Sequence, residues 1–309
     1  MTTSLNPAQR RVLELLGRPA VPPPPAADGL AGHVVAALET GLADVAPQLA
    51  GERIHVNKHA LARIHGCERH YLGTHTDFEW TARTARGSVV HKAVQLTVNW
   101  RGEPHPPHLV DEALAILVDG DDGLARWLGG VGEAVRAELR SEAVDLVSAF
   151  QECFPPLKAA WRPVTETAVR IDLFGGLVRL TGRVDLTLGT PSGDRPDKVI
   201  VDLKTGVPAA HHRDDLRFYA LVETVRMGVP PRQLATYYLD AARVEVEDVT
   251  PAILDAALAR TIDGTRKLIE VLRAQRAATV SPGALCGWCP LRSDCSEGTA
   301  HWDEQLAWR

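Results

Sequence analysis

The chain has 309 residues, of which 45% are hydrophobic and 24% are charged, ordinary values for a globular protein of one large or two modest domains. No stretch of 18 apolar residues occurs, which excludes a membrane-spanning helix, and the N-terminus lacks the layout of a signal peptide. We therefore expect a cytoplasmic protein without a membrane partner. Thiols stay reduced there, so disulfides are the weaker explanation for its five cysteines.

The net charge of −5 does not indicate nucleic-acid binding, but the charges are unevenly distributed. Residues 53–92 hold seven Lys or Arg against three acids, whereas residues 109–148 hold three Arg against nine acids. A local basic stretch can contact phosphates even in an acidic protein. An ordinary solvated surface is the alternative explanation of the same pattern.

The N-terminal part of the chain is predicted to be helical. Residues 6–17 predict a short amphipathic helix, residues 21–27 form a proline-rich linker, and residues 28–50 predict a further helix. We expect residues 1–52 to form an N-terminal helical segment in front of one large domain, residues 53–309.

Three further helical stretches are expected before the sheet. Asn57 can cap a helix that runs toward Cys67, and a second helix, roughly residues 89–98, carries His91. Residues 109–153 repeat apolar positions at helical spacing with one break, which predicts an inserted pair of helices.

The period then changes to that of strands alternating with helices. The predicted elements are strands 165–173 and 178–188, joined by Gly175-Gly176, strand 199–204, helix 212–227, strand 233–239 and helix 251–276. Strands flanked by helices predict an α/β core sheet, with the N-terminal and 109–153 helices packed around it.

Two of these strands carry a candidate metal site. The period of two puts Asp202 and Lys204 on one face of their strand, and Asp185 converges on them if the neighbouring strands pair. Carboxylates are preferred by hard divalent cations, and a lysine can stabilise charge in a phosphoryl transition state. His91 would favour a transition metal such as manganese. An Asp-x-Lys pattern alone is commonly a surface ion pair, but Asp202 ends an apolar strand, where a buried acid needs a partner.

The cysteines form a second candidate site. Cys286, Cys289 and Cys295 have the spacing Cys-x2-Cys-x5-Cys, and a fourth ligand must come from Cys67 or Cys153. Four thiolates suit either zinc or an iron–sulfur cluster, and the spacing does not separate the two.

Five motifs in order give these pieces a family resemblance. They are GSVVH at 87–91, GRVD at 182–185, VDLKTG at 201–206, DLRFY at 215–219 and CGWCPLRSDC at 286–295. From about residue 55 to 297 the chain resembles the PD-(D/E)xK nuclease superfamily. More narrowly, it is similar to the RecB/AddB-type exonuclease domain and its relatives with an iron–sulfur cluster, including the CRISPR-adaptation nucleases. The resemblance implies a restriction-endonuclease-like core sheet.

The resemblance also implies roles for residues at the metal site. His91, Asp185, Asp202 and the carbonyl of Leu203 would bind Mg²⁺ or Mn²⁺, and the two aspartates would act in catalysis through that ion. Glu166 is a candidate outer acid.

The same resemblance assigns Lys204 as the catalytic lysine. It matches Tyr219 to the tyrosine of a Gln-x3-Tyr helix that faces the active site and DNA. Asp215 replaces the glutamine of that motif, which places the DNA contact in question.

By the same resemblance, Cys67 and the C-terminal trio would hold a structural [4Fe–4S] cluster that joins the two ends of the nuclease domain. Cys153 is then expected to be a buried small residue, and Trp288 to shield the cluster from water. Trp302 and Trp308 are expected to pack within the protein rather than to stack on bases.

The function implied is a metal-dependent deoxyribonuclease acting on single-stranded DNA ends, in DNA repair, recombination or the processing of foreign DNA. No Walker loop occurs, so helicase activity must come from a partner protein. Two alternatives remain open. One is a DNA-binding or scaffold subunit that keeps the fold without turnover, and the other is a zinc-containing protein with no nucleic-acid role.

Overall fold

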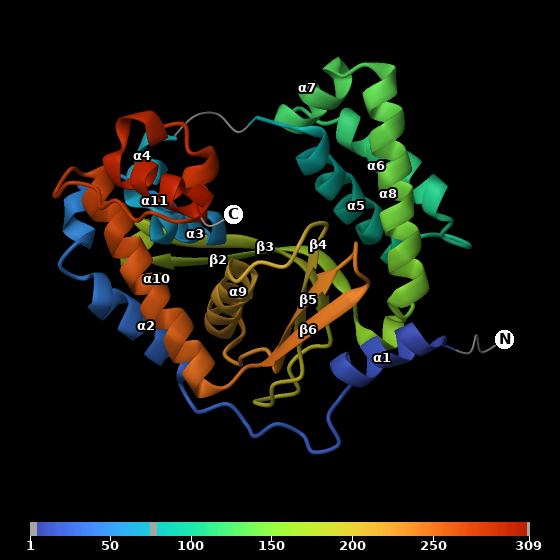
Figure 1. Cartoon of the computed structure of the whole chain (residues 1–309). Coiled ribbons are helices and arrows are strands. Elements are labelled where there is room, and N and C mark those ends of the chain that lie inside the picture. The colour runs from blue at the N-terminus through green and yellow to red at the C-terminus, as the bar shows by residue number, and fades with distance from the viewer. Residues whose placement is uncertain (1–4, 75–78, 308–309) are drawn as a thin grey trace.

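The computed structural model describes residues 5–74 and 79–307. A mixed six-stranded sheet lies at its centre, between two groups of helices (Figure 1). The fold is thus the α/β sheet flanked by helices that the alternation of periods predicts.

The strands are β1 (Ile54–Val56), β2 (Val164–Leu173), β3 (Val178–Leu188), β4 (Val199–Lys204), β5 (Gln233–Tyr238) and β6 (Arg243–Asp248). β2 and β3 form the predicted hairpin, and the turn between them uses Gly175 and Gly176 at φ 63° and 94°. Glycine adopts these left-handed angles without a Cβ penalty. β1 and β6 were not predicted, because β1 has three residues and the residues of β6 are exposed or half-buried along its length.

The pairing around β3 leaves an opening in the sheet. β2 pairs with one edge of β3 over residues 178–187. The other edge is shared, because β1 pairs there with residues 178–180 and β4 with residues 186–188. Among the described strands, none pairs with that edge between residues 181 and 185. The backbone end of β1 and the helix that follows it lie next to this gap.

One face of the sheet carries a helical layer that shares a single apolar core with it. Its helices are α2 (Leu30–Leu42), α3 (Lys58–Gly66), α4 (Glu68–Gly73), α9 (His211–Met227) and α10 (Pro251–Leu272). The last helix, α11 (Ser296–Ala307), lies beside α4 at the outer end of this layer (Figure 1). The 28–50 stretch is not one helix, since α2 ends at Leu42 and is followed by the 3-10 turn Ala46–Leu49.

The opposite face is covered by a second layer with its own apolar core. Its helices are α1 (Pro7–Leu16), α5 (Ala82–Asn99), α6 (Pro106–Val118), α7 (Gly123–Gly130) and α8 (Glu133–Cys153). The inserted segment therefore holds three helices where two were expected.

Helix α5 also begins earlier than expected. Thr81 caps it by accepting a hydrogen bond from the Thr84 backbone N–H at 3.2 Å, so the helix starts at Ala82 rather than near residue 89. Gly87 is inside the helix, where a Cβ would stand 3.3 Å from Thr205 Oγ1. This glycine lets α5 approach the loop that follows β4. No helix in the described part of the chain is long and apolar enough to cross a membrane.

Candidate metal centre

A cavity of about 550 Å³ opens at the gap between β1 and β4. All six residues expected in the metal and catalytic sets line it: His91, Asp185, Asp202, Leu203, Lys204 and Tyr219. They come from α5, β3, β4 and α9, so the fold brings together side chains that are up to 128 positions apart in the sequence.

The two aspartates are neighbours because of the β3–β4 register. The antiparallel ladder ends at the pair Leu186–Val201, so Asp185 and Asp202 stand directly beyond it on adjacent strands. Asp185 Oδ2 accepts a hydrogen bond of 2.7 Å from the Leu203 backbone N–H. This bond ties the carboxylate of β3 to the end of β4 and fixes its orientation toward the cavity.

His91 stands between two of the groups expected as metal ligands. Its Nε2 lies 3.0 Å from the Leu203 carbonyl oxygen, and its Nδ1 lies 3.5 Å from Asp185 Oδ1. Burial opposes the charged imidazole, but Asp185 more than offsets it and raises the pKa of His91 to about 9. The surrounding oxygens thus favour a positive charge at this position.

Glu166 completes the densest group of ligand atoms. Ligand atoms of His91, Glu166 and Asp185 lie within 4.8 Å of one another, the single such group among the described residues. Glu166 has φ +53°, a left-handed angle that costs a non-glycine residue about 1–2 kcal/mol. Burial, and then the neighbouring Asp185, raise the pKa of its carboxyl. The resemblance had suggested only an outer role for this acid.

Asp202 is held by two lysines rather than by that group. Its side chain is 1% exposed, Lys58 Nζ donates to Oδ1 at 2.9 Å, and Lys204 Nζ forms an ion pair with Oδ2 at 2.7 Å. Burial opposes the charge of the carboxylate, but the two ammonium groups more than offset it, so the pKa of Asp202 lies below its usual range. Sequence reasoning missed Lys58, because its only signal is its place two residues after a three-residue strand.

Helix α9 contributes Asp215 and Tyr219, one turn apart. The Tyr219 hydroxyl donates to the Arg183 carbonyl at 2.7 Å, and burial raises the pKa of Tyr219 to about 12. Asp215 is 7% exposed and faces Lys58 and Lys204, at 3.9 and 3.8 Å. Its carboxylate therefore faces the lysines of the site.

The four cysteines of the second candidate site line one small cavity of about 20 Å³. Cys67 joins α3 to α4, and the trio Cys286, Cys289 and Cys295 precedes α11. No three described cysteine sulfurs lie within 4.8 Å of one another. Sulfurs that share a zinc ion would be about 3.8 Å apart, given a Zn–S distance of about 2.3 Å. The described chain therefore has four thiols around one cavity and no assembled thiolate site.

The tryptophans of the C-terminal segment and the fifth cysteine follow the expectations only in part. Trp288 is 70% exposed, so the expectation that it shields the cysteines is wrong: the short 3-10 turn that carries it turns its ring outward. Trp302 packs against Gly287 and beneath the Arg292 guanidinium, as expected. Cys153 lies apart at the end of α8, where it is half-buried. Trp308 lies outside the described residues.

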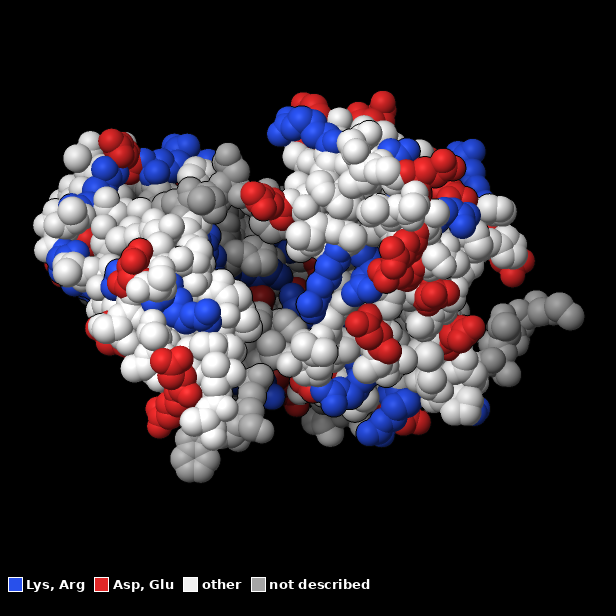
Figure 2. Space-filling model, turned by 45° about the horizontal axis from the view of Figure 1, so that its top comes forward, with Lys and Arg blue, Asp and Glu red and all other residues white. Residues whose placement is uncertain are grey.

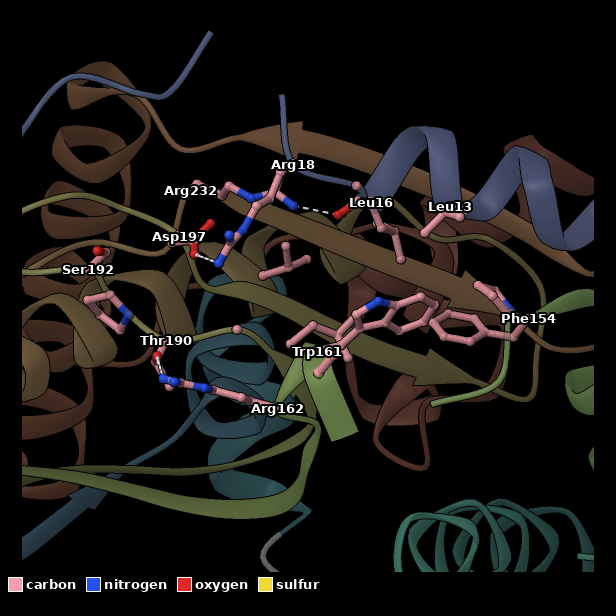
Figure 3. A pocket seen from close by; sticks show the side chains of 17 residues that line it. Leu13, Leu16, Arg18, Phe154, Trp161, Arg162, Thr190, Ser192, Asp197 and Arg232 are labelled. Atoms are coloured by element: carbon pink, nitrogen blue, oxygen red, sulfur yellow. Dashed lines mark hydrogen bonds and ion pairs between the residues drawn. The ribbon is translucent and has the colours of Figure 1, made fainter. Parts of the chain in front are cut away.

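A second large cavity, of about 500 Å³, lies by the C-terminal end of β3 (Figure 3). Its lining mixes apolar and polar residues and includes Trp161; Arg18 pairs with Asp197 at 2.5 Å, and Arg162 donates to Thr190 at 2.8 Å. The carboxylates and the imidazole described above are not among its lining residues. That imidazole and two of those carboxylates line the cavity between β1 and β4 instead.

Comparison with known proteins identifies a family. A family model described as the PD-(D/E)XK nuclease superfamily matches residues 57–296. No curated protein matches the chain. A crystal structure of a candidate exonuclease from Eubacterium rectale has a TM-score of 0.47 at 12% identity, over 80% of this chain and 90% of its own.

The structure of SSO0001 has a TM-score of 0.29 at 14% identity, over 78% of this chain and 95% of its own. At these scores neither likeness carries an argument about function. The family match extends over most of the chain and includes both strands of the site, so the chain belongs to the PD-(D/E)XK nuclease superfamily.

Proposed function

We propose that the protein is a metal-dependent deoxyribonuclease that hydrolyses phosphodiester bonds. The observation that carries this proposal is the convergence of Asp185, Asp202, Lys204 and His91 in one cavity at the gap in the sheet. Two acids, an amine and an imidazole are the side chains that such a reaction uses.

The donor set fits Mg²⁺ or Mn²⁺. His91, Asp185, Asp202 and the Leu203 carbonyl would hold the ion, with Glu166 added by the structure as a further carboxylate. Carboxylate oxygens suit both ions, and the imidazole favours manganese. The bound ion would supply Lewis acidity and lower the pKa of a water molecule.

The chain's own groups would orient the substrate and balance its charge. The Lys204 ammonium, next to Asp202, is placed to stabilise negative charge that develops on the phosphate. Tyr219 lines the same cavity and its hydroxyl is anchored to β3, so its ring forms a fixed wall beside the reacting group.

DNA is the proposed substrate, with single-stranded ends cleaved as an exonuclease would. Figure 2 shows the surface hollowed between the two helical groups, with Lys and Arg side chains along the hollow. Arg86 of α5 donates to the Thr205 carbonyl at 3.1 Å, and the exposed Arg83 lies one turn before it. Guanidinium groups beside the cavity favour phosphate binding.

We further propose that Cys67, Cys286, Cys289 and Cys295 bind a structural [4Fe–4S] cluster. The support is that all four line one cavity, Cys67 from the α3–α4 junction and the other three from the C-terminal segment. Analysis of anaerobically purified protein for iron, acid-labile sulfide and zinc tests this. Four irons per chain are expected, and one zinc without iron would instead make the site a zinc site.

The biological setting would be DNA repair, recombination or the processing of foreign DNA, in the reducing cytoplasm and with a helicase or another partner protein. A non-catalytic DNA-binding subunit is the rival. The presence of Asp185, Asp202 and Lys204 together argues against this rival, because a subunit that only binds DNA does not need these three charged side chains.

Digestion of end-labelled single- and double-stranded DNA, with Mg²⁺ and Mn²⁺ compared, tests the proposal. We expect metal-dependent release of label from single strands, reduced at least about 100-fold in Lys204→Ala. Lys267→Ala, on α10 outside the cavity, is the matched control. Equal cleavage by wild type and Lys204→Ala, or none by either, would remove the catalytic assignment.

A further inference from the structure

Lys58 is the charged residue of the cavity that no sequence motif singles out. It is the first residue of α3, directly after the cap Asn57, and its side chain is 10% exposed. Its Nζ lies 2.9 Å from Asp202 Oδ1, 3.9 Å from Asp215 Oδ2 and 4.9 Å from the centre of the Tyr219 ring. One buried amine thus links the ends of β1 and β4 with helix α9.

The position of Lys58 follows from the gap in the sheet. β1 ends where its pairing with β3 stops, at Val56 opposite Leu180, and the chain turns there into α3. The first turn of α3 therefore points its lysine into the space that a longer β1 would have filled. The residue reaches Asp202 across 144 positions of sequence because of this topology alone.

Asp215 has the opposite charge to Lys58 and is about as deeply buried. It is 7% exposed, and the two ammonium groups of Lys58 and Lys204 face it at 3.9 and 3.8 Å. A neutral side chain at position 215 would leave both ammonium groups facing Asp202 alone. A buried charge whose partner is removed is strongly destabilised, so the two lysines and two aspartates form a balanced set.

We propose that Lys58 is a positioning residue that holds Asp202, and that Asp215 acts through Lys58 rather than on DNA or on the metal ion. The proposal rests on the proposed metal-dependent function and deepens it. The Lys58–Asp215 pair sets how much of the negative charge of Asp202 is available to a divalent cation.

Opposite effects on metal affinity follow from this arrangement. Lys58→Met removes a positive charge beside Asp202, so Mn²⁺ should bind about tenfold more tightly, while cleavage falls because Asp202 loses its support. Asp215→Asn frees Lys58 to neutralise Asp202 more fully, so Mn²⁺ should bind about tenfold more weakly. The double variant Lys58→Met/Asp215→Asn restores the balance, and its Mn²⁺ affinity should return to within about threefold of the wild type.

Calorimetric titration of the full chain with Mn²⁺ measures these affinities without any cleavage. The ion pair Lys267–Asp263 on α10, at 2.7 Å, supplies the matched controls Lys267→Met, Asp263→Asn and their double variant, which should bind Mn²⁺ like the wild type. Thermal unfolding checks that each variant is folded. If Lys58→Met does not fold, Lys58→Gln, which can still donate to Asp202, has the same expected direction.

The outcomes separate the two proposals. Restored Mn²⁺ affinity in the double variant supports the inference even if no DNA is cleaved. Absence of cleavage would then contradict only the proposed nuclease function. Affinity that stays low in the double variant makes Asp215 a metal ligand and overturns the inference while cleavage by the wild type stands. Single variants that change Mn²⁺ affinity in the same direction also overturn it. A protein that binds no Mn²⁺ overturns both.

Discussion

Gly182 of β3 lies directly against the ring of Tyr219 on α9, so that a Cβ built on this glycine would overlap the ring. The contact explains why a residue without a side chain stands three positions before Asp185. It also sets how closely α9 approaches the gap in the sheet, and therefore how near Tyr219 comes to the site.

Gly182→Ala should therefore move Tyr219 and cost about 1–3 kcal/mol of unfolding free energy, the usual effect of overpacking. Cleavage should fall with it. Tyr219→Ala removes the ring that the new Cβ would overlap. The double variant Gly182→Ala/Tyr219→Ala should therefore be more stable than the sum of the two single effects predicts. Denaturant unfolding of the four proteins measures this coupling, and strict additivity would show that the two residues do not touch.

Glu166 combines a candidate metal-ligand position with a left-handed backbone, and two substitutions separate these features. Glu166→Gln keeps the backbone and removes the charge, so Mn²⁺ affinity should fall about tenfold. Glu166→Gly should lose the same affinity but gain about 1 kcal/mol of stability, because glycine adopts this angle freely. Calorimetry and unfolding curves test both, and unchanged Mn²⁺ affinity in the two variants would place Glu166 outside the metal site.

Arg83 is exposed at the N-terminal end of α5, within reach of the loop after β4. Arg83→Ala should weaken single-stranded DNA binding without sequence preference and reduce the slope of log K against log salt by about 0.7. A fluorescence titration over a series of salt concentrations measures the slope. Arg11→Ala, on α1, is the control; if both variants keep the wild-type slope, α5 does not contact the phosphates.

The stability of the protein should depend on pH through Glu68. Its carboxylate forms two hydrogen bonds with Arg276, at 2.5 and 2.8 Å, and accepts a third from the Thr279 backbone N–H at 2.8 Å. The Arg276 guanidinium, as the main cause, lowers the pKa of Glu68 from 4.5 to about 2. The stabilisation is therefore complete above pH 4.5 and is lost as the pH falls through about 2.

This stabilisation amounts to about 2 kcal/mol, with allowance for solvent around Arg276. Glu68→Gln should lower the unfolding free energy by that amount at pH 7 and flatten its fall in acid. The exposed pair Asp111–Arg140 gives the control, since Asp111→Asn should cost less than about 1 kcal/mol. Equal losses in the two variants would mean that the buried position of Glu68 gives it no special weight.

Much of the sheet could be predicted because strand alternation depends only on neighbouring residues. The bounds of β3 and β4 follow from their apolar positions, and the same period places Asp202 and Lys204 on one face. β1 could not be predicted, because three residues are too few to establish a period and its stability comes from pairing with β3, which is far away in the sequence. Missing β1 also meant missing Lys58.

The start of α5 and the partners of Asp202 show the same limit. A glycine normally weakens a helix interior, so Gly87 argued for a later start, but close packing against Thr205 favours a residue without a Cβ there. Asp202 needed a cation, which the apolar strand around it indicated. The sequence could not show that Lys58, 144 positions away, is one of the cations that pair with Asp202.

The amino-acid sequence by itself determined the hairpin, the two central strands and the order of the nuclease motifs, since each rests on local periods and short-range spacing. Only the tertiary structure decided that Lys58 and Glu166 enter the site and that Trp288 faces outward. These outcomes depend on which strand edges stay unpaired and which charges are buried together, and no local pattern encodes either.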